Sequence, residues 1–386
     1  MSGLIKIEAE WAKRGPAQTV CGLLTDAGYQ AWFVGGCVRN ALIGARVADL
    51  DITTDALPEP VMALAKAAGL RVIPTGIEHG TVTVLAQSQP FEVTTLRRDV
   101  ATDGRHAKVA FTDQIADDAR RRDFTMNALY AQPDGTVIDP LGGLADLMAR
   151  RIRFVGDPDA RITEDYLRIL RFFRFHAWYG DPAEGVDAEG LAACAAHLDG
   201  LEQLSRERLG AEMRKLLAAP DPAPAMAAMR SCGALLRILP GAGTGLLTVL
   251  IHVEEVAGLH PDPIRRLTAL GGEDMAQALR LSNAEAAKLA RLREGLENTL
   301  SAKVLGYHFG ASEALDILAL RAASFEQEID PVQAELVKFG AAQTCPVRAA
   351  DLMPALQGPA LGQALKTLES RWIASDFTLS KAALLG

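Results

Sequence analysis

The segment 32–55 constrains this chain most, because it combines a glycine turn with two closely spaced aspartates. Residues 32–34 are aromatic and β-branched, which favours a buried strand. Gly35 and Gly36 allow a tight turn whose backbone N–H groups face an incoming anion. We expect a short helix over 37–43, and a helix that begins behind such a turn favours a bound phosphate.

Charged side chains complete this segment. Arg39 adds a positive charge within the short helix. Asp49 and Asp51 alternate along an expected strand, so they share one face, while Leu50 and Ile52 point into the core. Two carboxylates on one face repel each other unless a cation lies between them. Mg2+ prefers such oxygen ligands and usually shares them with substrate phosphates.

Each motif also has an ordinary structural explanation. A glycine pair alone is usually only a turn, and a lone Asp-x-Asp is usually a solvated strand face or a loop. Found together and in this order, a phosphate-binding turn and a carboxylate pair are what a metal-dependent nucleotidyl transfer requires.

The segment resembles the head of the tRNA nucleotidyltransferase (CCA-adding enzyme) and bacterial poly(A) polymerase superfamily. Its signature is Gly-Gly-x-Val-Arg-Asp followed by Asp-x-Asp, which residues 35–51 follow with one departure. Asn40 replaces the usual Asp, so it keeps the hydrogen-bonding capacity and loses the charge. An ion pair at this position is therefore in doubt, whereas the metal pair is not.

The length and composition suit a multidomain protein of this kind. We expect an α+β fold in which a nucleotidyltransferase head with a small mixed sheet (1–150) precedes an all-helical neck (151–240) and a tRNA-binding body and tail (241–386). The five cysteines have no paired spacing, which favours a reducing compartment and argues against a zinc site. We see no signal peptide and no apolar run of membrane-spanning length, so we expect a cytoplasmic protein.

The net charge of −8 argues against a protein that coats nucleic acid nonspecifically. It leaves room for a local basic patch that grips a small RNA.

A hairpin is expected after the acidic strand, with strands over 81–84 and 91–96. Glu92 faces away from its apolar neighbours. It is either a third catalytic carboxylate near Asp49 and Asp51 or a solvent-facing residue, and the sequence does not decide between them.

Residues 97–118 show neither helical nor strand periodicity, and such long segments are often functional. Asp103, Gly104 and Arg105 match the flexible loop of the CCA-adding family. The resemblance implies that this loop takes part in switching from C to A addition.

The run 121–128 reads Arg-Arg-Asp-Phe-Thr-Met-Asn-Ala. Asp123 and Asn127 are four residues apart, so on a helix they share a face. The simpler interpretation is a capping Asp beside a solvated basic run. The superfamily has nearly the same eight residues here, and this implies that Arg122, Asp123 and Asn127 contact the phosphates and ribose of a nucleotide.

A helix is expected from Ile162 to Trp178, capped by Thr163, with Asp165, Arg168 and Arg171 on one polar face. A surface ion pair is the ordinary explanation.

A specific chemistry is also available to this face. Cytosine and adenine both present an amine donor beside a ring-nitrogen acceptor, whereas uracil and guanine present the reverse. A carboxylate and a guanidinium therefore select C and A. Glu164 to Arg168 match the Glu-Asp-x-x-Arg motif of the superfamily, which implies that Asp165 and Arg168 read the base and that Arg171 orients the nucleotide.

The residues and the resemblance together predict an Mg2+-dependent enzyme that adds C, C and A to the 3′ end of tRNA from CTP and ATP. Rival interpretations are a poly(A) polymerase, an enzyme that adds only CC or only A, and a non-catalytic RNA-binding protein. Residues 75–82 resemble the CCA-adding branch and lack the basic Gly-Arg-Arg-Phe segment of the poly(A) branch. The sequence does not give the oligomeric state.

Overall fold

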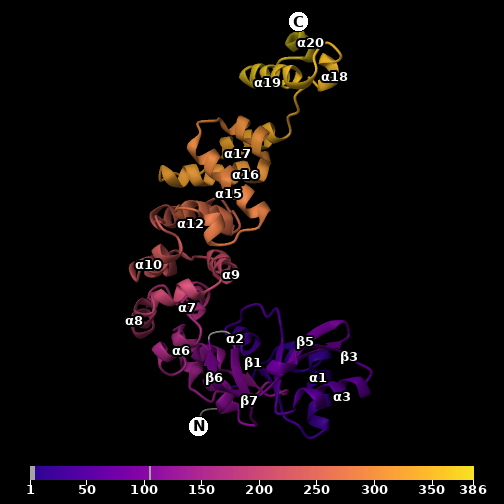
Figure 1. Ribbon diagram of the computed structural model, residues 1–386, viewed down its shortest axis with the longest axis vertical. Coiled ribbons are helices and arrows are strands. Elements are labelled where there is room, and N and C mark those ends of the chain that lie inside the picture. The colour runs from indigo at the N-terminus through magenta and orange to yellow at the C-terminus, as the bar shows by residue number, and fades with distance from the viewer. Residues whose placement is uncertain (1–4, 104–105) are drawn as a thin grey trace. The chain divides into compact units, whose positions relative to one another are not determined.

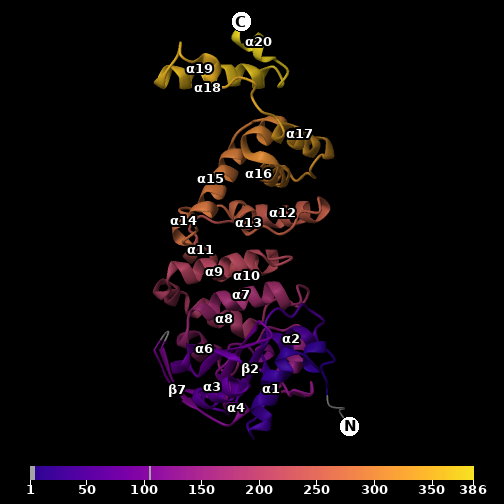
Figure 2. The same ribbon diagram turned by 90° about the vertical axis from the view of Figure 1, so that its right-hand side faces the viewer.

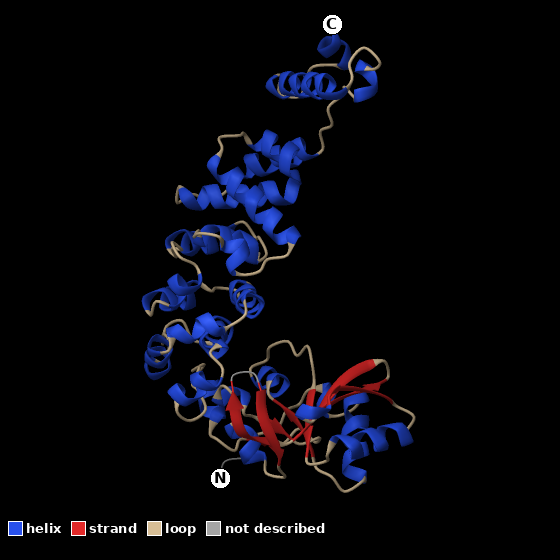
Figure 3. Ribbon diagram, in the orientation of Figure 1, coloured by secondary structure: helices blue, strands red, loops and turns tan. Residues whose placement is uncertain are grey.

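The computed structural model describes residues 5–103 and 106–386, without the side chains of residues 99–108. The chain forms two compact units, residues 1–240 and 241–386. Figure 3 shows that the strands belong to the first unit and that helices make up the second. The expected α+β class is thereby confirmed. The finer division of the first unit into a head and a neck stays a prediction.

A mixed sheet forms the centre of the head, with the strand order β3-β4-β5-β2-β1-β8-β9. Strands β2 and β5 pair in parallel, and the other neighbours pair antiparallel. The parallel pair matters most, because it fixes which residues of β5 lie beside the acidic strand β2. The strands are β1 (Ala31–Val34), β2 (Asp51–Thr54), β3 (Arg71–Gly76), β4 (Thr81–Ala86), β5 (Gln89–Thr95), β8 (Tyr130–Ala131) and β9 (Val137–Ile138).

Two helices pack against this sheet, α1 (Pro16–Asp26) and α3 (Pro58–Ala67). Each begins with proline, whose fixed φ suits the first helical turn. The short helix α2 (Gly36–Leu42) follows β1 directly, as the glycine turn predicts. The core at this end of the sheet includes Trp32, Leu96 and Tyr130.

The segment that the sequence presents as structureless forms a hairpin instead. Strands β6 (Arg97–Asp103) and β7 (His106–Phe111) pair antiparallel in a separate two-stranded sheet. The expectation of an irregular loop over 97–118 is therefore wrong. The hairpin closes through its own backbone hydrogen bonds, so it does not need the apolar alternation that a strand on a core requires.

Helices continue the first unit beyond the sheet, and α7 lies against α9 and α10 (Figures 1 and 2). Phe124 of the head packs against Phe154 and Phe175, with ring centroids 5.0 and 4.9 Å apart. This aromatic cluster joins the head to the helices. The remaining helices are α4 (Ile115–Arg120), α5 (Gly143–Met148), α6 (Pro158–Glu164), α7 (Leu167–Tyr179), α8 (Ala188–Ala196), α9 (Arg206–Leu217), α10 (Ala223–Ser231) and α11 (Ala234–Ile238).

The second unit is helical, and proline lies in the first turn of α13, α17 and α19. Asp262 caps α13, and Gly358 with Pro359 begins α19. The C-terminal segment packs through Trp372 and Phe377 against Tyr307 of α16. The helices are α12 (Gly245–Val256), α13 (Pro263–Leu270), α14 (Met275–Ala278), α15 (Asn283–Glu297), α16 (Ala302–Ser324), α17 (Pro331–Ala341), α18 (Ala349–Leu352), α19 (Gly358–Ala374) and α20 (Lys381–Leu385).

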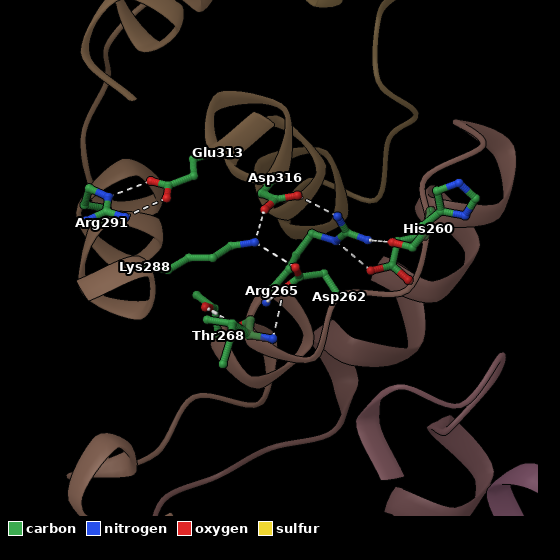
Figure 4. Close-up of polar contacts among 10 residues, drawn as sticks. His260, Asp262, Arg265, Thr268, Lys288, Arg291, Glu313 and Asp316 are labelled. Carbon is green, nitrogen blue, oxygen red and sulfur yellow. Dashed lines mark hydrogen bonds and ion pairs between the residues drawn. The ribbon is translucent and has the colours of Figure 1, made fainter. Parts of the chain in front are cut away.

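A buried ionic cluster lies inside the second unit (Figure 4). Arg265 donates from Nε to Glu254 Oε1 at 2.7 Å and from Nη1 to Asp316 Oδ1 at 2.6 Å. The Nζ atom of Lys288 lies 2.7 Å from Asp262 Oδ2 and 2.8 Å from Asp316 Oδ2. Buried charges are tolerated when they are paired in this way, so the cluster ties α12, α13, α15 and α16 together. Across the described residues, no helix combines the length and the apolarity needed to cross a bilayer.

Candidate active site

Two carboxylates lie side by side on the parallel strands of the head. Asp51 is the first residue of β2, and its Cα partner on β5 is Glu92. Glu92 lies beside Asp51 and is also exposed to solvent, so its role as a third catalytic carboxylate stays a prediction. Burial raises the pKa of Asp51, and the nearby charges of Glu92 and Asp49 add to the rise, while Arg122 opposes it. Repulsion among these acids makes the group receptive to a cation.

Asp49 differs from its expected position. Strand β2 begins only at Asp51, so Asp49 lies before it and is exposed, and Leu50 is only partly buried. The reason is that pairing with β5 starts at Asp51, and nothing holds the preceding residues in a strand. Over the ranges that the structure describes, no three His, Cys, Asp or Glu side chains are arranged as a complete metal site. One or two carboxylates suffice for Mg2+ that also binds substrate phosphates.

The glycine turn brings an arginine close to this group. Gly35 has a φ of +71°, and its N–H donates to the Leu129 carbonyl at 3.0 Å. A Cβ atom there would lie 3.3 Å from Nη1 of Arg122. Glycine is therefore needed for both the left-handed backbone and the close approach of the guanidinium.

Asp118 holds Arg122 in place. Its fully buried carboxylate accepts from Arg122 Nη2 at 2.9 Å and from the Tyr130 hydroxyl at 2.7 Å. Burial alone would raise the pKa of Asp118, but Arg122 and Arg121 outweigh it and lower the pKa to about 2. The carboxylate is thus ionised at neutral pH and orients Arg122 next to the turn.

Asp123 and Asn127 lie together, although not on an α-helix. Residues Thr125–Asn127 form a single 3-10 turn, so the expected helical face is wrong. Asn127 Nδ2 nevertheless donates to Asp123 Oδ1 at 2.9 Å, and Arg171 Nε donates to Asp123 Oδ2 at 2.8 Å. Burial acts to raise the pKa of Asp123, but Arg171 and Asn127 outweigh it and hold this pKa below its ordinary value.

Arg39 is buried and does not project freely from its helix. Its guanidinium donates to Asn127 Oδ1 and to the Tyr179 hydroxyl, the latter at 2.7 Å. It also lies 4.0 Å from the centroid of the Tyr179 ring, within range of a cation–π contact. Arg39 therefore links the glycine turn to α7, the helix that carries Arg171.

The expected continuous helix over 162–178 is broken, and Thr163 does not cap it. Helix α6 ends at Glu164, Asp165 is extended with a φ of −155°, and α7 begins at Leu167. Thr163 lies within α6 and donates back to the Asp159 and Ala160 carbonyls.

Asp165 uses both carboxylate oxygens. Oδ1 accepts from the Leu167 N–H at 3.1 Å, because the first turn of α7 leaves this donor without a partner in the helix. Oδ2 accepts from Arg208 Nη2 at 2.7 Å. Arg168 pairs with Glu164 and donates to the Arg161 carbonyl at 2.8 Å. The side chains of Asp165 and Arg168 thus have separate partners, contrary to the single polar face that the sequence predicts.

Two family models match segments of the chain. Residues 31–153 match the model of the poly(A) polymerase head domain, and residues 186–244 match that of the probable RNA and SrmB binding site of polymerase A. Over these segments the chain is similar to the CCA-adding enzyme and bacterial poly(A) polymerase superfamily.

Curated members of the superfamily resemble this chain over its first part. The mitochondrial CCA tRNA nucleotidyltransferase 1 of Mus musculus is 43% identical over 196 residues, which are 50% of this chain and 45% of that protein. The CCA-adding enzyme of Levilactobacillus brevis is 43% identical over 208 residues, 53% of this chain and 51% of that protein. The match therefore spans about half the length of these relatives.

A solved structure of the superfamily matches over nearly the whole chain. The CCA-adding enzyme of Bacillus stearothermophilus in complex with CTP has a TM-score of 0.77 and 28% sequence identity, and the match covers 94% of this chain and 93% of that one. The CCA-adding enzyme of Thermotoga maritima complexed with tRNA has a TM-score of 0.68 at 18% identity, which supports the fold alone.

Two residues that hold side chains of these motifs in place were not predicted from the sequence. Asp118 lies three and four residues before Arg121 and Arg122, a spacing that predicts helical ion pairs and was available in the sequence. Arg208 lies in α9, and only the fold brings it to Asp165. Of the flexible-loop residues expected for the superfamily, Gly104 and Arg105 lie outside the described residues, and Asp103 is described only as the end of β6.

Proposed function

We propose that this chain adds C, C and A in order to the 3′ end of tRNA from CTP and ATP, releasing pyrophosphate. The observation that carries the proposal is the carboxylate pair Asp51 and Glu92, which lies on two parallel strands beside a glycine turn and the guanidinium of Arg122. Acids receptive to a cation and a phosphate-facing turn are the parts that nucleotidyl transfer needs. The relatives named as CCA-adding enzymes support the choice of reaction.

Asp49 and Asp51 are the proposed Mg2+ ligands, with Glu92 as a neighbouring catalytic carboxylate. A bound divalent ion supplies charge neutralisation at the triphosphate and lowers the pKa of the attacking 3′ hydroxyl. The elevated pKa of Asp51 supports this assignment, because a cation relieves the repulsion that causes it. Gly35 and Gly36 leave room for the triphosphate, and Arg122 neutralises part of its charge.

The nucleotide's sugar and base take separate groups in this proposal. Asp123, which Asn127 and Arg171 hold in place, accepts from a ribose hydroxyl. Asp165 accepts from the exocyclic amine of C or A, and Arg168 donates to the adjacent ring nitrogen. A wrong base presents the reverse hydrogen-bonding pattern and cannot replace the internal contacts that these groups give up, which makes its rejection strong.

Both base-reading residues have internal partners in the structure. Asp165 keeps its backbone contact to Leu167, so only the Oδ2 atom bonded to Arg208 has to be shared with a base. Arg168 has to exchange its contact with Glu164 or with the Arg161 carbonyl. The binding of C or A therefore shares the Asp165 Oδ2 atom with Arg208 and exchanges one contact of Arg168.

The second unit, residues 241–386, is the proposed binding region for the body of the tRNA. A cytoplasmic location is also part of the proposal, and five cysteines without disulfides support it.

An extension assay tests this function. A tRNA transcript that ends at its discriminator base is incubated with Mg2+ and either CTP, ATP, both nucleotides or the UTP and GTP pair. Three added residues with both nucleotides and two with CTP alone support CCA addition. Two residues even with ATP present would identify a CC-adding enzyme, and A added only to a transcript that already ends in CC would identify an A-adding one. A long ladder with ATP alone would identify a poly(A) polymerase, and no extension would favour a binding protein.

A further inference from the structure

The side chain of Asn40 forms a junction of three hydrogen bonds between Arg39 and the segment that leads to the proposed catalytic carboxylates. Its Oδ1 atom accepts from Arg39 Nε at 3.0 Å and from Arg39 Nη2 at 2.9 Å. Its Nδ2 atom donates to the Arg46 carbonyl at 2.8 Å. One amide thus joins a buried guanidinium to the backbone of the segment that leads to Asp49.

The orientation of this amide follows from its neighbours. A guanidinium only donates hydrogen bonds, so the side facing Arg39 is the oxygen. A backbone carbonyl only accepts, so the side facing Arg46 is the nitrogen. An ionised Asp at this position is able to satisfy Arg39 but has no hydrogen to give to Arg46. The junction therefore requires Asn, which is the residue in which this chain departs from the superfamily signature.

On one side, the junction reaches the helix proposed to orient the nucleotide. Arg39 donates to the Tyr179 hydroxyl at the end of α7 and to Asn127, which in turn contacts Asp123. Asp123 accepts from Arg171, also on α7. Arg39 is thus connected to α7 both directly and through a chain of side-chain hydrogen bonds.

On the other side, the junction fixes the chain just before the carboxylates. Helix α2 ends with the Ala45 N–H bonded to the Asn40 carbonyl at 2.8 Å, and the Asn40 side chain then holds Arg46. Beyond this point the chain has no regular structure until β2 begins at Asp51. Arg46 is therefore a fixed point three residues before the exposed Asp49.

We propose that Asn40 is a positioning residue that couples α7 to the placement of Asp49, and that the donor half of its amide performs this coupling. This inference rests on the proposed function, in which Asp49 is a metal ligand and α7 orients the nucleotide. Asn40 itself contacts neither group. It acts by restricting where the segment 46–50 places the Asp49 carboxylate.

The first test compares Asn40→Asp and Asn40→Ala in the full chain. Both variants lose the donor to Arg46. Asn40→Asp keeps the acceptor for Arg39 and gains a charge, whereas Asn40→Ala loses that acceptor as well. We expect both to raise the Mg2+ concentration for half-maximal CMP addition by about fivefold, the cost of one net hydrogen bond, and to leave the KM for tRNA unchanged. Gln18→Glu is the matched control, because Gln18 also donates from its amide nitrogen, Nε2, to a backbone carbonyl, that of Pro133 at 2.8 Å, and lies outside the proposed catalytic and tRNA-binding residues.

The second test does not depend on activity. Hydrogen exchange of the peptide covering residues 44–50 is measured in the unliganded proteins, and we expect it to be about fivefold faster in both Asn40 variants than in the wild type or the Gln18→Glu control. Unchanged exchange in both variants would overturn the inference. A normal Mg2+ requirement in Asn40→Ala beside a raised one in Asn40→Asp would also overturn it, because the added charge would then explain the loss. Failure of the proposed function would instead appear as an inactive wild type.

Discussion

The Oδ2 atom of Asp165 accepts a hydrogen bond at 2.7 Å from Nη2 of Arg208, a residue 43 positions further along the chain. This contact crosses from the break between α6 and α7 to the first turn of α9. It orients the proposed base-reading carboxylate and attaches it to a separate helix. In the proposed mechanism, the choice of base therefore depends on Arg208, a residue outside the base-reading motif.

Replacing Arg208 with Ala is expected to loosen base selection. The Asp165 carboxylate would lose its partner and adopt several orientations, so the hydrogen-bonding pattern for C and A would be less strictly enforced. We expect the ratio of kcat/KM for UTP to that for CTP to rise about tenfold, the equivalent of one charge-assisted hydrogen bond. Single-nucleotide addition kinetics measure this ratio. Arg206→Ala serves as the control, because Arg206 begins the same helix but is exposed.

Replacing Asp51 with Asn is expected to reduce nucleotide addition by about a thousandfold or more, because the amide cannot supply the charge that holds a metal. The affinity for tRNA, measured by filter binding, should stay within about twofold, since the change is small and local. Asp26→Asn, an exposed substitution on α1, controls for the loss of a negative charge in the head. An Asp51→Asn variant with substantial activity would remove Asp51 from the metal site.

The acidic limb of the activity profile should lie above the ordinary Asp range. Burial and the charge of Glu92 raise the pKa of Asp51, and a protonated carboxyl does not hold Mg2+. Glu92→Gln removes one repelling charge, so it should move this limb to lower pH. Rates of CMP addition at fixed Mg2+ across the acidic pH range measure the shift. A limb that stays in place would show that Asp51 titration does not control it.

The raised pKa of Asp51 should also affect the stability of the folded protein. A carboxyl whose folded-state pKa exceeds its unfolded-state pKa costs stability once it is ionised, so this cost appears as the pH rises through the raised pKa. At neutral pH, Mg2+ should therefore raise the Tm of the wild type by binding the folded state. The Asp51→Asn variant should show a smaller rise, and an equal rise in both proteins would place the bound ion elsewhere.

The contribution of Asp118 to stability should have the opposite pH dependence to that of Asp51. Its pKa is lowered to about 2, so its contribution is present above the unfolded-state pKa and is lost as the pH falls toward 2. Asp118→Asn leaves two arginines without their buried counter-charge, and we expect a loss of about 3 kcal/mol in the free energy of unfolding. Urea denaturation at several pH values measures both effects. Asp117→Asn is the control, because Asp117 lies on the same helix and its pairing with Arg120 is largely exposed.

The local parts of the site were predictable from the sequence. Strand β1, the glycine turn, α2 and the acidic strand follow from residue types over a short stretch, where backbone preferences dominate. The position of Glu92 was only half predictable. Alternation gives its face on the hairpin, but the parallel pairing of β2 with β5 decides that it lies beside Asp51.

The predictions that the structure contradicts were wrong for physical reasons. A continuous helix through Asp165 agrees with the charges and apolar residues around it, yet Asp also satisfies the free N–H groups of a new helix, and here it bonds Leu167 and Arg208 instead. The hairpin β6–β7 was not predicted because neither of its strands belongs to the main sheet, so its sequence shows no apolar alternation. The periodicity of a sequence predicts local elements and does not predict contacts between distant segments.

The most direct test of the central claim is the sequence of the 3′ ends that the enzyme makes when all four nucleotides compete. A tRNA transcript ending at its discriminator base is incubated with Mg2+ and equal CTP, ATP, UTP and GTP, and the products are sequenced individually. The account predicts that the ends read CCA and that U and G are essentially absent. Ends that contain U or G at frequencies comparable to C would contradict the account, because Asp165 and Arg168 would then not select the base. Runs of A of variable length would also contradict it, because the reaction would then be poly(A) synthesis.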